Sequence, residues 1–140
     1  MTKLPDKPSE LIELALKDLA LVEKDKRYEV DMDNWHMPAL YEDVCKVCFA
    51  GAVIAGTLDK APDQDLYPSV KYFDIDTVDK LCALDYFRAG KIFSGLETMG
   101  LSDLPQPWML DAYVAYYEDD PRKFRKDLHA MARKLKEQGL

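Results

Sequence analysis

One apolar segment, residues 41–58 (YEDVCKVCFAGAVIAGTL), limits the possible folds more than any other part of the chain. From Val47 to Leu58 only Thr57 is polar, and a helix drawn through this run is apolar on most sides. Such a helix belongs in a protein interior. A membrane-spanning helix needs about 20 apolar residues, and this run is shorter. We therefore expect a buried central helix over residues 41–58, with a buried strand as the alternative reading.

The length and composition predict a single domain. The 140 residues can enclose one core without disulfides or metal, and 48% hydrophobic with 32% charged residues is typical of globular proteins. We expect one domain over residues 1–140, with residues 1–7 frayed. The first residues, MTKLPDKPSE, contain no secretory signal, and the three cysteines fit reduced thiols better than a disulfide framework. These features predict a cytoplasmic protein that does not enter a membrane.

The net charge of −7 is distributed unevenly along the chain. Residues 1–120 hold 12 Lys/Arg and 24 Asp/Glu, a balance of −12, whereas residues 121–140 hold 7 and 2, a balance of +5. A nucleic-acid-binding domain presents a basic face, and only the last segment could supply one. We interpret its cations as a solvated face lying against an acidic body, and we predict no direct binding to nucleic acid.

Hydrophobic periodicity predicts a helix before the central segment and another after it. The first begins at Pro8 with Ser9 as its N-cap and ends near Lys24, with its apolar stripe facing the core. The second covers residues 77–89 with Asp76 as its N-cap, and its spacing continues to residue 100.

Two more helices are expected near the end of the chain. Residues 108–118 form one, and Asp120 caps the last, with Pro121 at its first position, where a missing N–H costs nothing. The predicted fold is therefore mainly α, a compact bundle of five or six helices around the central buried helix.

A minor β ribbon is also predicted. Apolar Tyr28, Val30 and Met32 alternate with acidic residues, which indicates a short strand. Residues 69–75 show similar alternation and are the expected partner strand. The ribbon would have two strands.

One cluster of Cys and His residues could carry chemistry. Cys45 and Cys48 would lie on one side of the predicted helix, His36 precedes them, and Cys82 could arrive from the next long helix. A tetrahedral zinc site uses this mixture of ligands. Packing in the core is the favoured interpretation, because cysteine is often a buried small hydrophobe. A redox role needs a thiol at a helix N-terminus, whereas Cys45 would lie about a turn inside.

Other catalytic patterns are weaker. Asp31, Asp33, Asp74 and Asp76 could be brought together by the ribbon to bind Mg²⁺ or Ca²⁺, although a solvated surface is favoured. The sequence contains no EF-hand spacing, phosphate-binding glycine loop or Gly-x-Ser-x-Gly elbow. These observations favour a protein that is not an enzyme, with no cofactor, or with zinc in the metal-binding alternative.

Aromatic and acidic residues near the end of the chain indicate a surface for a protein partner. Tyrosine and tryptophan provide large contact areas at low entropic cost. The candidate partner-binding residues are Trp108, Tyr113, Tyr116, Tyr117, Glu118, Asp119 and Asp120. In the alternative interpretation, Tyr113 and Tyr117 belong to the core and Tyr116 lies at its rim.

Trp35-His36, followed by Cys45-x-x-Cys48-x-Ala50-Gly51-Ala52, resembles small proteins encoded in phages and prophages. The resemblance covers mainly residues 28–58. It implies a short accessory protein that binds and modulates a host or phage macromolecule, and it brings no catalytic residues with it.

Two functional hypotheses follow. The first is a non-catalytic protein-interaction module of unknown partner, with a homo-oligomer as one form. In a narrower version, the acidic body imitates the charge of nucleic acid and occupies a basic site on its partner. The second is a zinc-binding protein or enzyme built on His36, Cys45, Cys48 and Cys82.

Overall fold

The computed structural model describes residues 3–31, 34, 36–39, 43–63, 73–84, 117 and 120–140. These residues form four helices and three short strands, so the fold is mainly helical, as predicted. The helices are α1 (Pro8–Lys24), α2 (Phe49–Ala55), α3 (Ile75–Leu84) and α7 (Pro121–Glu137), and the strands are β1 (Tyr28–Val30), β2 (His36–Met37) and β3 (Cys45–Val47).

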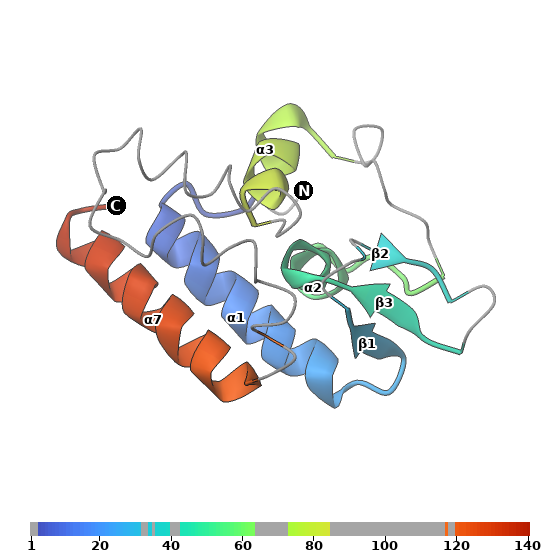
Figure 1. Ribbon diagram of the computed structural model, residues 1–140. Helices are drawn as coiled ribbons and strands as arrows, with labels where there is room; N and C mark the ends of the chain where they lie inside the picture. The colour runs from blue at the N-terminus through green and yellow to red at the C-terminus, as the bar shows by residue number, and fades with distance from the viewer. Residues whose placement is uncertain are drawn as a thin grey trace.

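Helix α1 lies between α7 and α2 and also contacts α3 and β1 (Figure 1). It runs antiparallel to α7, since Glu23 near its end pairs with Arg125 near the start of α7. At the other end, the Ser9 hydroxyl donates to the carbonyl oxygen of Leu140 at 2.5 Å. Ser9 is therefore not the N-cap that the sequence predicted. The cap lies two residues earlier, at Lys7, and Pro8 is the first residue of the helix.

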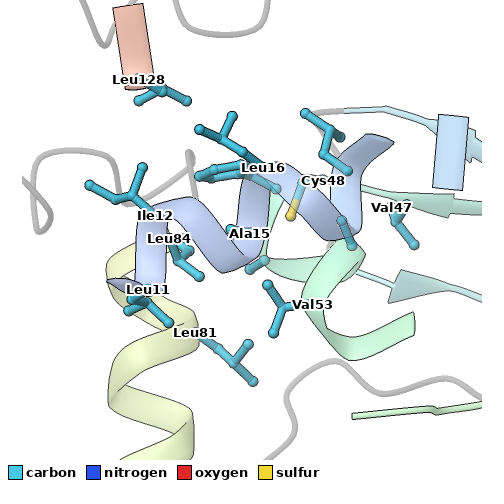
Figure 2. Close-up of a cluster of buried hydrophobic side chains, with 14 of the residues drawn as sticks. Leu11, Ile12, Ala15, Leu16, Val47, Cys48, Val53, Leu81, Leu84 and Leu128 are labelled. Carbon is cyan, nitrogen blue, oxygen red and sulfur yellow. The ribbon is translucent and has the colours of Figure 1, made fainter. Parts of the chain in front are cut away.

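The apolar stripe predicted for α1 is confirmed. Its apolar residues at helical spacing are all buried: Leu11, Ile12, Ala15, Leu16, Leu19 and Val22. Side chains from β3, α2 and α3 pack around this stripe, together with Cys48, which lies between β3 and α2 (Figure 2).

The predicted central helix over residues 41–58 is wrong in its first part. Cys45–Val47 form a strand, and α2 covers only Phe49–Ala55. The strand alternative was right for Cys45, Lys46 and Val47, because Lys46 is half-exposed between two buried residues in a period-two pattern. The helical part is buried as expected, because all residues from Phe49 to Ile54 are buried.

The sheet has the order β1-β3-β2 and mixed direction. Strand β1 pairs in parallel with β3, placing Tyr28 beside Cys45, and β2 pairs antiparallel with β3, placing His36 beside Val47. The strand predicted from Tyr28 is therefore confirmed over Tyr28–Val30. The expected two-stranded ribbon with residues 69–75 is replaced by this three-stranded sheet; residues 69–72 lie outside the described part, and Ile75 begins α3.

The N-cap predicted for α7 is confirmed, whereas the N-cap predicted for α3 is not. Asp120 caps α7 as predicted, accepting from the backbone N–H of Lys123 at 3.1 Å, with Pro121 in the first turn. The expected cap of α3 is wrong: Asp74, not Asp76, accepts from the backbone N–H of Thr77 at 2.7 Å.

The described part of the chain holds four helices, not the expected five or six. The helix predicted over 108–118 and the continuation of α3 from residue 85 to residue 100 lie outside it, apart from Tyr117. None of the described helices combines the length and apolar character that crossing a membrane requires.

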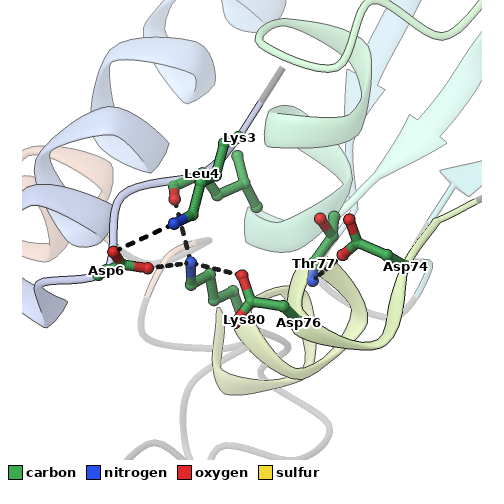
Figure 3. A network of polar contacts seen from close by, with 7 residues as sticks. All are labelled: Lys3, Leu4, Asp6, Asp74, Asp76, Thr77 and Lys80. Carbon is green, nitrogen blue, oxygen red and sulfur yellow. Dashed lines mark hydrogen bonds and ion pairs between the residues drawn. The ribbon is translucent and has the colours of Figure 1, made fainter. Parts of the chain in front are cut away.

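A polar network joins the start of the chain to α3 (Figure 3). Lys80 Nζ donates to the carbonyl oxygen of Leu4 at 3.0 Å and to carboxylates of Asp6 and Asp76, each at 2.8 Å. The Leu4 side chain is 1% exposed and belongs to the core. Leu4 lies within residues 1–7, which the sequence predicted to be frayed, so its burial was not expected.

Candidate functional site

The Cys and His residues of the predicted cluster lie around the small sheet. Cys45 belongs to β3 and Cys48 precedes α2 as its N-cap, so the two do not share a helix face as predicted. The Cys45 sulfur lies 3.8 Å from both ring nitrogens of His36 on the neighbouring strand β2. The structure therefore brings His36 and Cys45 together, although they are nine residues apart in sequence.

Burial determines what this pair can do. Cys45 and Cys48 are 0% exposed and His36 is 1% exposed. Burial raises the pKa of the Cys45 thiol to about 12, so the thiol keeps its proton at neutral pH. A protonated, enclosed thiol is neither a nucleophile nor an accessible redox group. Both cysteines are packed in the hydrophobic core.

Metal binding needs more ligands than the described residues supply. Among them, no group of three or more His, Cys, Asp or Glu side chains could hold an ion. Cys82 belongs to α3, but its side chain lies outside the described part, as does Asp33.

The other three aspartates of the predicted cation site have local roles. Asp31 accepts from the Asn34 amide at 2.9 Å, and Asp76 pairs with Lys80 at 2.8 Å. The hydrogen bonds from Thr77 lower the pKa of Asp74. Each carboxylate is thus used in a turn, an ion pair or a helix cap.

Tyr117 and Asp120 are the two residues of the predicted partner surface that the structure describes. Tyr117 is 8% exposed, and its ring packs edge-on against Phe124 with the centroids 5.2 Å apart. Its hydroxyl donates to Glu23 at 2.5 Å, and burial raises its pKa. Asp120 caps α7. Outside the described residues lie Trp108, Tyr113, Tyr116, Glu118 and Asp119.

Asp18 is a buried charged residue that the sequence interpretation missed. It is 3% exposed, on the face of α1 that α2 covers, and it accepts from the Thr57 hydroxyl at 2.6 Å and from the Thr57 N–H at 3.2 Å. Burial raises the pKa of its carboxyl, and the hydrogen bonds from Thr57 oppose that shift. The available signal was an aspartate next to Leu19 within an apolar stripe. Its role is to hold the turn that follows α2.

The outer face of α7 carries a row of exposed basic residues. Its buried face contains Phe124, Leu128, Met131, Ala132 and Leu135. On the solvent side, exposed residues recur at intervals of four, three, four and three: Arg122, Lys126, His129, Arg133 and Lys136. We name this set the α7 cationic stripe.

Comparisons with models of known protein families, with curated proteins and with solved structures found no match. The resemblance to small phage- and prophage-encoded proteins stays a prediction from residues 28–58. Function must therefore be inferred from the burial, charge and packing of this chain.

Proposed function

We propose that this chain is a non-catalytic module that binds another protein through charged surface residues. The observation that carries the proposal is the separation of charge: α7 exposes a cationic face, whereas residues 1–120 have a balance of −12. Charge arranged in this way gives specificity and orientation in protein association.

The positions of the reactive groups support a role without catalysis. Three residues of the predicted Cys and His cluster are enclosed by the core, namely His36, Cys45 and Cys48. A substrate would have to displace packed side chains to reach them. The exposed groups in the described residues are mainly charges and isolated apolar side chains, which suit binding better than bond breaking.

Affinity purification from cells that express the chain naturally tests this proposal. We expect one protein to be retained at constant stoichiometry and to be displaced by untagged chain. Added salt should release it, because salt screens the attraction between exposed charges over a Debye length of about 10 Å at 0.1 M ionic strength. The oligomeric state of the purified chain, measured by light scattering, shows whether the partner is a second copy. A monomeric chain that retains no protein under low-salt conditions would contradict the proposal.

Zinc binding is the second candidate, and the contact between His36 and Cys45 favours it. Two adjacent ligands are half of a tetrahedral set, and the described residues supply no third ligand beside them. Elemental analysis after expression with added zinc provides the test. Stoichiometric zinc that is lost in Cys45→Ser would support this candidate, and substoichiometric zinc in the wild type would remove it.

A further inference from the structure

We infer that the α7 cationic stripe binds an acidic helical segment of the partner protein. The inference deepens the proposed function and rests on it. It names both the surface used by this chain and the chemistry of the surface that it meets.

The stripe is continuous along one side of the helix. Residues spaced by three and four lie on the same face of an α-helix, so Arg122, Lys126, Arg133 and Lys136 are aligned. With a rise of 1.5 Å per residue, the stripe is about 21 Å long. The apolar residues that pack against α1 occupy the opposite side, so packing in the core leaves the stripe exposed.

These cations are available for a partner. Within the described residues, no carboxylate lies at ion-pair distance from Arg122, Lys126, Arg133 or Lys136. Arg125 differs, because it pairs with Glu23 and joins α7 to α1. Arg125 thus stabilises the fold, whereas Arg122, Lys126, Arg133 and Lys136 are exposed and form no ion pair with the described carboxylates.

An acidic helix fits this pattern. Carboxylates at i, i+4, i+7 and i+11 of a facing helix recur with the same intervals as the stripe, so several pairs can form in one register. Nucleic acid fits less well, because domains that bind it have a high isoelectric point and this chain has one near 4.8.

Two variants with the same charge change separate the stripe from the general charge of α7. Lys126→Glu with Arg133→Glu reverses two residues in the stripe. Lys123→Glu with Lys134→Glu reverses two exposed cations outside the stripe. These two residues lie on the side of the helix that carries Ala130. Circular dichroism and thermal unfolding of both variants verify that each is folded.

Two fluorescent peptides serve as probes, and anisotropy at low ionic strength measures binding. One is an alanine-rich helix with glutamates at i, i+4, i+7 and i+11. The other has the same composition, with its glutamates spread around the helix. We expect the wild type to prefer the first peptide, and the stripe variant to bind it roughly tenfold more weakly, with a smaller change for the other variant.

Four results would overturn the inference: no binding of the first peptide, equal affinity for both peptides, equal losses in both variants, or tighter binding of duplex DNA or anionic vesicles than of the peptide. None of them removes the proposed function on its own. A stoichiometric protein partner that is retained by the stripe variant would show that the module binds through another surface.

Discussion

Asp18 shows how one buried charge makes stability depend on pH. Its carboxyl lies between α1 and the turn after α2, and burial raises its pKa despite two hydrogen bonds from Thr57. The folded protein therefore holds this proton more tightly than the unfolded chain. The stabilising contribution is complete below the ordinary pKa of aspartate and is lost as pH rises through the raised value.

Asp18→Asn should remove this dependence, because an amide cannot ionise and its oxygen can still accept from Thr57. We expect the free energy of unfolding of the variant, relative to wild type, to rise from acidic to neutral pH. Urea unfolding at a series of pH values measures it. Asp6→Asn is the control with the opposite sign, since hydrogen bonding to Lys80 lowers the pKa of Asp6. Identical pH profiles for wild type and Asp18→Asn would contradict the prediction.

Gly56 is required by the same contact. A Cβ at this position would lie 2.5 Å from Asp18 Oδ1 and 2.6 Å from Asp18 Cγ, which is too close for real atoms. We expect Gly56→Ala to destabilise the fold by about 1–3 kcal/mol through overpacking, as measured by urea unfolding. In an Asp18→Ala background the loss should shrink, because the carboxyl group that causes the clash is gone. An undiminished loss would place the strain elsewhere.

At the scale of elements, the two ends of α7 are joined to α1, and its start is capped by Asp120. Asp120→Ala should lower the free energy of unfolding by about 1 kcal/mol, because the N–H of Lys123 loses its acceptor. Asp120→Asn keeps an acceptor oxygen and should recover most of the loss. Chemical denaturation of the three proteins provides the measurement, and equal stability of the Ala and Asn variants would contradict the capping role.

Elements whose signal is local could be predicted from sequence. The apolar stripe of α1 and the cap of α7 depend on residues within a few turns, and both are confirmed. The change from strand to helix at Cys48 could not be predicted, because it depends on β3 pairing with both β1 and β2. Contacts between strands decided the structure of Cys45–Val47 more strongly than the apolar run that follows.

The candidate site was less predictable than the fold for the same reason. The contact of His36 with Cys45 arises from the β2–β3 pairing, and the burial of Asp18 arises from its partner Thr57, which is 39 residues away. Residue types suggested a metal cluster in the first case and gave little signal in the second. The α7 cationic stripe, by contrast, follows from the helical spacing of its residues together with the position of the buried face of α7.

At the scale of the whole molecule, Lys80 connects segments that are far apart in sequence. It holds the carbonyl oxygen of Leu4 and the carboxylate of Asp6 against α3. Lys80→Met keeps most of the side-chain volume but removes these bonds. We expect faster amide hydrogen exchange in residues 3–7 and around the start of α3, with little change in α7, by mass spectrometry of peptic fragments. Unchanged exchange at residues 3–7 would show that burial of Leu4 alone secures this segment.

The position of α1 between α7 and α2 has a consequence for how the protein is made. Because α1 precedes α7 along the chain, the ribosome makes α1 first, and the side chains of Leu16 and its neighbours stay exposed to water on that side until α7 follows. Until Phe124 and Leu128 have been made, the nascent chain exposes the apolar side of α1 that they cover. Exposed apolar surface of this kind favours chaperone binding or aggregation. The hydrophobic core is therefore completed only after α7 has been made.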